Sequence, residues 1–212
     1  MFCMTADKER PCTSFAVTSA KPSEGKSLTA ANIAISYAML GKKVLLIDAD
    51  MRKPTQRRLW RVEKPTGLCD FLAKISKLEL DKVKDLPLWI VCTGTIPPNP
   101  SELLSSERMK RFVEESAKVY DYIIIDTPPI NTVADAQIVS TYVDGVVLVV
   151  KSGDTTEDEL NEAIDAVRRA GGNLCGTVLN GLNMKSVKNA YKYKYGGKYG
   201  YKYSYSESYE AR

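Results

Sequence analysis

A Gly-Lys-Ser turn between a strand-like segment and a helix-like run constrains this chain more than any other feature. Residues 15–19 are apolar and β-branched, residues 20–27 read Ala-Lys-Pro-Ser-Glu-Gly-Lys-Ser, and an amphipathic run follows to Leu40. A strand, a glycine-containing turn and a helix N-terminus in this order can wrap phosphate groups with backbone N–H groups. The arrangement predicts a nucleotide triphosphate site, although Ala20 stands where the full phosphate-loop pattern has its first glycine.

Strand-like and helix-like segments alternate along the rest of the chain. We expect strands at 15–19, 43–47, 88–93, 122–125, 145–150 and 174–179, and helices at 28–40, 101–119 (with Ser101 as its cap) and 156–169. This alternation predicts an α/β P-loop NTPase fold, a mostly parallel sheet with helices on both faces. The expected organisation is an N-terminal arm at 1–14, one nucleotide-binding domain at 15–184 and a tail at 185–212.

Acids and an amide follow the expected strands. Asp48 and Asp50 come after one strand, Asp126 after another and Asn180 after the last. The carboxyl ends of parallel strands meet at the edge of the sheet where ligands bind. Asp and Asn also begin ordinary turns, but that explanation does not account for all of them beside a Gly-Lys-Ser turn.

Composition excludes several kinds of chemistry. The chain has no His, which excludes His general bases, Ser-His-Asp triads and His-ligated metals. Its five cysteines are scattered without Cys-x-x-Cys spacing, so we expect reduced thiols and a cytoplasmic protein. No apolar run reaches the roughly 18 residues of a spanning helix, and the first residues lack the pattern of a signal peptide. Contact with a membrane would then need a partner.

The chemistry of a phosphate site assigns roles to these residues. Backbone N–H groups of 21–27 would surround the phosphates, with Lys26 reaching the β/γ oxygens and the Ser27 hydroxyl binding Mg²⁺. Mg²⁺ prefers oxygen ligands and keeps several waters, which suits Asp50 and Asp126. In a chain without His, the proton acceptor for a hydroxyl nucleophile must be a carboxylate, and Asp48 is the candidate; otherwise it caps the next segment. The basic run of Arg52, Lys53, Arg57, Arg58, Arg61 and Lys64 is typical of a solvated face, or it binds a phosphate or an acidic partner.

The C-terminal residues differ sharply in composition from the rest. The segment from Lys185 carries a net charge of +5 and leaves about −1 for the other residues, so the main domain gives no reason to expect nucleic acid binding. Between Tyr191 and Ala211 there is no aliphatic side chain, and we expect disorder. Eight of the twelve tyrosines lie here, namely Tyr191, Tyr193, Tyr195, Tyr199, Tyr201, Tyr203, Tyr205 and Tyr209.

Taken together, these motifs resemble the bacterial tyrosine kinases of capsule and exopolysaccharide synthesis, over about residues 15–209. Residues 20–27 are similar to the family's Walker A motif, 44–52 (Val-Leu-Leu-Ile-Asp-Ala-Asp-Met-Arg) to its Walker A′ and 122–129 (Tyr-Ile-Ile-Ile-Asp-Thr-Pro-Pro) to its Walker B. The terminal tyrosine cluster completes the set. Walker A occurs in many NTPases, but Walker A′ together with this tail is specific.

The resemblance implies a cytoplasmic autokinase that transfers the ATP γ-phosphate to the eight tail tyrosines, mostly of a neighbouring subunit in a homo-oligomer. It implies Lys26, Asp48 and Asp50 as catalytic residues, Ser27, Asp50 and Asp126 as Mg²⁺ ligands, and nucleotide contacts from a set of loop residues and a strand-end amide. That set is Lys21, Pro22, Ser23, Glu24, Gly25, Lys26, Ser27 and Asn180. It also implies a membrane-embedded chain-length-determinant activator that holds the kinase at the inner face of the membrane, and a cognate phosphotyrosine phosphatase.

Two other functions stay open. One is a Min/Par-like ATPase that hydrolyses ATP to switch dimerisation, because Lys21 occupies the position of the lysine that crosses the dimer interface in those proteins. The other is binding of single-stranded nucleic acid or an anionic polymer by the Tyr/Lys tail, since aromatic rings interleaved with cations suit that task. The bacterial kinases usually carry a helix with Glu and Arg residues upstream of the first strand that joins subunits into a ring, and here fourteen residues precede that strand.

Overall fold

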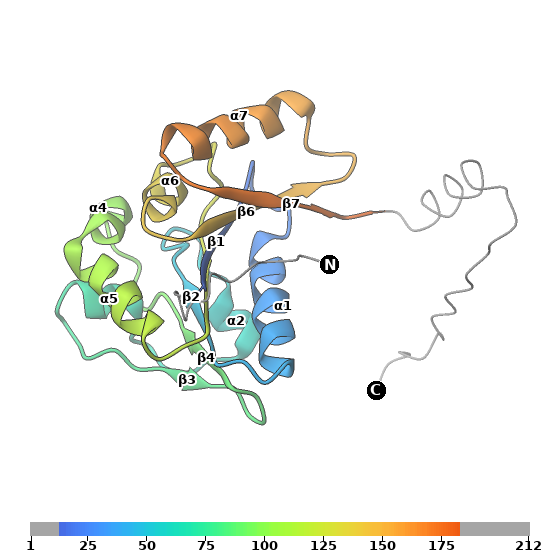
Figure 1. The fold of residues 1–212 in the computed structure, drawn as a ribbon. Helices are drawn as coiled ribbons and strands as arrows, with labels where there is room; N and C mark the ends of the chain where they lie inside the picture. Colours follow the sequence, from blue (N-terminus) through green and yellow to red (C-terminus); the bar gives the residue numbers. More distant parts are fainter. Residues whose placement is uncertain (1–12, 183–212) are drawn as a thin grey trace, which may run out of the picture. The chain divides into compact units, whose positions relative to one another are not determined.

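The computed structural model describes residues 13–182, which form a sheet with helices on both faces (Figure 1). The strands are β1 (Thr13–Ser19), β2 (Val44–Asp48), β3 (Asp81–Lys82), β4 (Leu88–Val91), β5 (Tyr122–Asp126), β6 (Gly145–Lys151) and β7 (Leu174–Asn180). The helices are α1 (Lys26–Met39), α2 (Gln56–Trp60), α3 (Leu68–Leu72), α4 (Pro100–Ser105), α5 (Glu107–Ala117), α6 (Asp135–Ser140) and α7 (Glu157–Arg169).

The sheet has the strand order β3-β4-β2-β5-β1-β6-β7. Every pairing is parallel except that of β3 with β4, so the predicted mostly parallel sheet is confirmed. Asp48 of β2 lies directly beside Asp126 of β5 in the register, and Val17 of β1 lies beside Asp126 on its other side. The carboxyl ends of these strands therefore bring the acids to the loop that follows β1.

Two apolar layers cover the faces of the sheet. On one face α1 packs through small side chains, Ala30, Ala31, Ala34 and Ala38, which allow the helix backbone to approach the strands closely. On the other face α3, α4, α5, α6 and α7 supply the apolar residues that cover the strands. Strands β2 and β5 lie between the two layers and are apolar at almost every position, as strands buried on both faces must be.

The helix predicted at 101–119 is instead two helices, α4 and α5, separated at Ser106. Ser106 has an extended backbone (ψ 146°), and its Oγ accepts a hydrogen bond from the Met109 N–H, which caps α5. A serine that caps a new helix competes with continuation of the old one. Ser101, the predicted cap, lies one residue inside α4 and its hydroxyl donates to Asp135.

Other differences from the predicted elements are small. Strand β1 begins at Thr13, so the last two residues of the predicted N-terminal arm belong to the sheet. Helix α1 begins at Lys26 rather than residue 28, and the short elements α2, α3, α6 and β3 had no predicted counterpart. Residues 1–12 and 183–212, which include the rest of the arm and the whole of the predicted tail, lie outside the described residues.

The described helices and thiols bear on two further expectations. Among the helices of residues 13–182, none combines the length and hydropathy that crossing a bilayer requires. Cys69, Cys92 and Cys175 are free thiols. Burial raises the pKa of both Cys69 and Cys92 to about 12, so these two thiols stay protonated at neutral pH.

Candidate nucleotide and phosphoryl-transfer site

The loop between β1 and α1 passes close to the end of β7 at Gly25. Gly25 has φ +91°, a left-handed conformation that suits glycine, and a Cβ there would overlap the side-chain amide of Asn180. Asn180, at the end of β7, donates from Nδ2 to the carbonyl of Glu24 (3.0 Å). The structure thus places the predicted adenine-contacting residue directly against the loop, where it holds the loop backbone.

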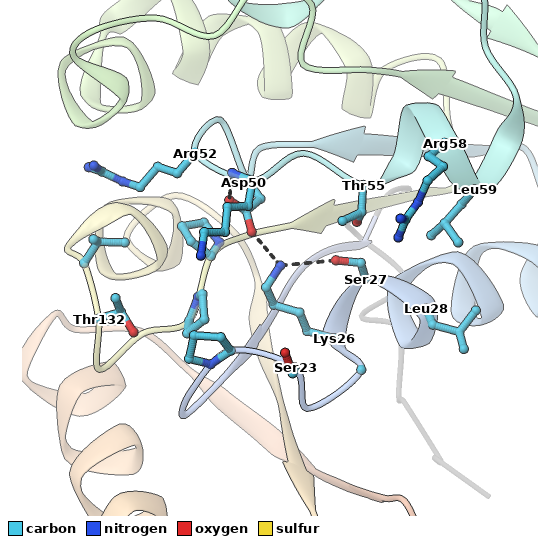
Figure 2. A pocket seen from close by; sticks show the side chains of 16 residues that line it. Ser23, Lys26, Ser27, Leu28, Asp50, Arg52, Thr55, Arg58, Leu59 and Thr132 are labelled. Atoms are coloured by element: carbon cyan, nitrogen blue, oxygen red, sulfur yellow. Dashed lines mark hydrogen bonds and ion pairs between the residues drawn. The ribbon is translucent and has the colours of Figure 1, made fainter.

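Lys26 is the centre of a charged cluster at the start of α1 (Figure 2). Its Nζ donates to Asp50 Oδ2 at 2.7 Å, to Ser27 Oγ at 3.2 Å and to Asp126 Oδ1 at 3.4 Å. Burial lowers the pKa of Lys26, but the carboxylates of Asp126 and Asp50 outweigh this effect and raise it above the ordinary value. Lys26 is therefore a fixed cation, and these predicted residues meet at one point.

Asp48 is fully buried and does not line the cavity beside Lys26. Its Oδ2 accepts hydrogen bonds from the backbone N–H groups of Thr55 (3.1 Å) and Gln56 (2.9 Å), and its Oδ1 has no hydrogen-bond partner among the described residues. Burial and the nearby charge of Asp126 raise the pKa of Asp48 to about 8. The carboxylate thus holds the segment that leads into α2 and is also a much stronger base than an ordinary aspartate.

Gln56 belongs to the cluster around Asp126, although no sequence motif marks it. It is completely buried, and its Nε2 donates both to Asp126 Oδ2 (2.8 Å) and to the Ser27 carbonyl (2.9 Å). Its Oε1 accepts from the indole N–H of Trp60 at 3.0 Å. Burial raises the pKa of Asp126, while Lys26 and Gln56 oppose that rise. Gln56 therefore fixes the orientation of the Asp126 carboxylate relative to the loop.

A cavity of about 480 Å³ opens beside this cluster (Figure 2). Its walls come from the loop and start of α1, from the segment between β2 and α2, and from the segment after β5. The lining residues are Pro22, Ser23, Gly25, Lys26, Ser27, Leu28, Asp50, Arg52, Lys53, Thr55, Arg58, Leu59, Pro128, Pro129, Thr132 and Val133. Asp50 and Ser27 thus face the cavity, whereas Asp48 and Asp126 do not line it.

The donor set suits Mg²⁺ held together with phosphates. Within residues 13–182, no group of three or more His, Cys, Asp or Glu side chains is arranged to hold a metal by itself. Mg²⁺ bound with a nucleotide needs less, because it keeps waters and takes one or two carboxylates together with phosphate oxygens. The Ser27 hydroxyl and the Asp50 carboxylate, both within 3.2 Å of Lys26 Nζ and both facing the cavity, fit that requirement.

Lys21 and Glu24 tie the loop to the junction of β6 and α7. The Lys21 ammonium donates to both Glu159 oxygens (3.0 and 3.2 Å) and to the Asp154 carbonyl (2.8 Å). The hydrogen bond to Glu159 raises the pKa of Lys21. Glu24 is buried and accepts from the Lys21 backbone N–H (2.9 Å) and from the Thr155 hydroxyl. Neither Lys21 nor Glu24 lines the cavity, although both are among the predicted nucleotide contacts.

The basic run after β2 separates into two groups. Arg52 pairs with the buried Asp135, Arg57 donates to two backbone carbonyls, and Lys64 pairs with Glu79 and Asp81. Lys53 and Arg58 line the cavity, as Arg52 does, but their side chains have no such partner within residues 13–182, and Arg61 is exposed at the end of α2. The interpretation of this run as one solvated face is therefore too simple. The eight predicted acceptor tyrosines lie outside the described residues.

Comparison with known proteins places this site in a family. Residues 13–173 match the family model described as an AAA domain. The tyrosine-protein kinase YwqD of Bacillus subtilis is 44% identical over 192 residues, 90% of this chain and 80% of the relative. The putative tyrosine-protein kinase CapB of Staphylococcus aureus is 38% identical over 195 residues, 91% of this chain and 84% of the relative.

Solved structures agree with this assignment. The kinase domain of Escherichia coli tyrosine kinase ETK superposes with a TM-score of 0.79 at 31% identity, covering 94% of this chain and 74% of that one. The MinC:MinD cell division complex of Aquifex aeolicus gives 0.70 at 26% identity, covering 84% and 72%. The fold is therefore shared with Min-type proteins, whereas the higher sequence identities are to tyrosine-protein kinases.

Proposed function

Because the chain belongs to the bacterial tyrosine-protein kinases, we propose that it transfers the γ-phosphate of ATP to the tyrosines of its own C-terminal cluster, mainly between neighbouring subunits. The observation that carries this proposal is the meeting of Lys26, Ser27 and Asp50 at one cavity, in a chain that ends in eight closely spaced tyrosines. Phosphorylation of that cluster would regulate synthesis and export of a capsular polysaccharide or exopolysaccharide.

In this proposal the loop residues hold ATP. Backbone N–H groups of residues 21–27 and the Lys26 ammonium hold the phosphates. Ser27 and Asp50 would ligate Mg²⁺, with Asp126 serving the metal directly or through water, and Asn180 would contact the adenine. Bound Mg²⁺ neutralises charge on the phosphate oxygens. Lys26 stays protonated throughout, because its carboxylate neighbours raise its pKa.

We assign the proton acceptor to Asp48. As the tyrosine oxygen forms its bond to the γ-phosphorus, the bond from phosphorus to the β-phosphate oxygen breaks, ADP leaves, and the phenolic proton passes to the Asp48 carboxylate. A pKa of about 8 makes the ionised carboxylate a much stronger base than an ordinary aspartate, so transfer should become faster as pH rises toward 8 and more of Asp48 is ionised. Since Asp48 is now capped by Thr55 and Gln56, the segment between Asp50 and Thr55 must shift for the tyrosine to reach it.

The proposed partners follow from the same family assignment. A membrane-embedded chain-length-determinant protein would activate the kinase and hold it at the inner face of the cytoplasmic membrane. A phosphotyrosine phosphatase would remove the tail phosphates, and copies of the chain would form a homo-oligomer through contacts between tail and site.

The test of this function is phosphotyrosine formation on the full chain. Incubated with Mg-ATP, the wild type should give a signal in an anti-phosphotyrosine blot, and a chain that ends after Asn189 should give none, because all eight acceptors are gone. Absence of signal from the wild type, even with a cytoplasmic segment of the activator added, would contradict the proposal. Tail-dependent binding of single-stranded nucleic acid by such a silent protein would favour the binding alternative.

A Min/Par-like ATPase is the second candidate, and Lys21 discriminates between the two. Because Lys21 is paired with Glu159 of its own chain, Lys21→Ala should lower the rate of tail phosphorylation by no more than about fivefold, the effect of losing one exposed ion pair. Glu159→Gln, which removes the same pair from the other side, should have a similar effect. A lysine that crosses an ATP-dependent dimer would behave differently: Lys21→Ala would abolish ATP-induced dimerisation in light scattering, and Glu159→Gln would not.

A further inference from the structure

One wall of the cavity is built differently from the part that holds Lys26 and Asp50. Leu28 of α1 and Leu59 of α2 line it with 54% and 42% of their surface exposed, and Arg58 stands beside them. Figure 2 shows all three side chains on the Ser27 side of Lys26, whereas Arg52 and Thr132 lie on the opposite side. We call the wall formed by Leu28, Arg58 and Leu59 the α1–α2 wall.

The α1–α2 wall suits a phenol ring. Single exposed leucines are common on protein surfaces, but two of them from different helices line one cavity next to the phosphate loop. Nucleotide phosphates gain nothing from leucine side chains, whereas an aromatic ring gains apolar contact from them. The wall therefore offers apolar surface to the side chain that arrives opposite ATP.

Arg58 gives this wall a positive charge that forms no ion pair with an acid in residues 13–182. Arg52, Arg57 and Lys64 in the same run all have partners, as described above. The side chains of Arg58 and Lys53 make no ion pair or hydrogen bond within residues 13–182, yet both line the cavity. An exposed cation at the entrance to a site selects among ligands by their charge.

The tail offers two chemically different kinds of acceptor. Tyrosines between 191 and 202 are interleaved with four lysines and no acid. Arg58 and Lys53 would therefore repel the lysines that flank these tyrosines. Residues 203–212 read Tyr-Ser-Tyr-Ser-Glu-Ser-Tyr-Glu-Ala-Arg, and Glu207 and Glu210 are the only acids of the tail. They flank Tyr209, and Glu207 lies two residues after Tyr205.

On the basis of the kinase function proposed above, we propose that Arg58, Leu28 and Leu59 form the acceptor subsite and that it selects the acidic end of the tail, residues 203–212, for phosphorylation first. The tyrosine ring lies on the two leucines while the Arg58 guanidinium pairs with Glu207 or Glu210. The basic stretch 191–202 follows later.

The full chain allows a direct test. After short incubations with Mg-ATP, cleavage after Lys202 separates the two parts of the tail, and mass spectrometry measures phosphate per tyrosine in each. In the wild type, tyrosines in 203–212 should be phosphorylated about fivefold faster than those in 191–202. This is the effect expected when one exposed ion pair forms with Arg58 in the first segment, while the lysines of the second segment are repelled. In Arg58→Glu this preference should reverse, and in Leu59→Ala both parts should slow while the KM for ATP is unchanged.

Arg61→Glu is the matched control, because it makes the same charge change on the same helix end outside the cavity. It should leave the wild-type order intact. The inference is overturned if Arg58→Glu keeps the wild-type order, if Arg61→Glu shifts the order equally, or if Arg58→Glu raises the KM for ATP without changing the order. Each of these results requires active wild-type enzyme, so they differ from the complete absence of phosphotyrosine that would contradict the kinase function itself.

Discussion

Replacing Asp48 with Asn is expected to end tail phosphorylation and also to stabilise the nucleotide-free protein above neutral pH. Phosphoryl transfer should fall by about 10²–10⁴-fold, the usual contribution of a general base. The carboxamide oxygen can still accept the hydrogen bonds from Thr55 and Gln56, so the start of α2 should persist. Phosphotyrosine formation and urea unfolding, both measured across pH, report the two effects separately.

The sign of the stability effect follows from the raised pKa of Asp48. The native protein binds this proton up to about pH 8, whereas the unfolded chain releases it near pH 4, so wild-type stability falls as pH rises through that interval. The slope is at most about 1.4 kcal/mol per pH unit for one proton. Asp48→Asn removes this contribution and should be more stable than wild type at pH 8, by up to about 5 kcal/mol if that slope holds across the four pH units.

Asp70→Asn provides a control with the opposite sign. Burial raises the pKa of Asp70, but hydrogen bonds from Thr95 and Gly67 outweigh burial and lower it. Its contribution to stability is present at neutral pH and is lost as pH falls, so Asp70→Asn should destabilise the protein where Asp48→Asn stabilises it. Equal effects of both variants on stability at pH 8 would contradict this account.

Replacing Lys26 with Met should abolish activity and destabilise the nucleotide-free fold. The ammonium is the only cation recorded within hydrogen-bond distance of Asp50 and Asp126 in the described residues, and Lys26 itself is buried. Removing one partner of a buried ion pair typically costs about 3–5 kcal/mol, and loss of a preorganised charge at the phosphates costs about 10²–10³-fold in rate. The loss of stability should shrink at low pH, where the carboxylates gain protons.

The double variant Lys26→Met, Asp50→Asn separates the two losses. Removing the carboxylate that pairs most closely with Lys26, at 2.7 Å, should restore much of the stability and none of the activity. Thermal unfolding measures the stability, and phosphotyrosine formation measures the activity. If the single variant is as stable as wild type at pH 8, the charge balance described for this cluster is wrong.

Much of the fold follows from patterns that buried parallel strands impose. The apolar runs of β2, β5 and β6 predicted strands close to where they lie, because strands covered on both faces must be apolar throughout. The single helix predicted at 101–119 was wrong because the segment contains no Gly or Pro to mark a break, whereas its apolar positions change phase between Leu104 and Met109, where Ser106 caps a new helix. Helix α2 was not predicted because its five residues are too few to show a helical period.

The clustering of Lys26, Ser27, Asp50 and Asp126 was predictable from the sequence, but the orientation of Asp48 was not. Asp48 and Asp50 are two residues apart, and on a strand such residues point to the same face. Strand β2, however, ends at Asp48, so that rule fails there: Asp50 faces the cavity and Asp48 faces inward. Gln56 was not predicted as a site residue, because nothing in the pattern of a basic run marks a glutamine within it as buried. Its role depends on contacts with Asp126, seventy positions away.

The contacts of Glu24 and Asn180 have a consequence for the thermodynamics of ATP binding. Fixing one residue of a mobile loop costs about 1–2 kcal/mol in conformational entropy, so ordering eight of them on binding would consume most of a ligand's affinity. Here the shape of the loop is held in advance by Thr155 and by the end of β7, which lie 131 and 156 positions from Glu24 along the chain. Changes at the far end of the sequence could therefore weaken nucleotide affinity without altering any residue of the loop.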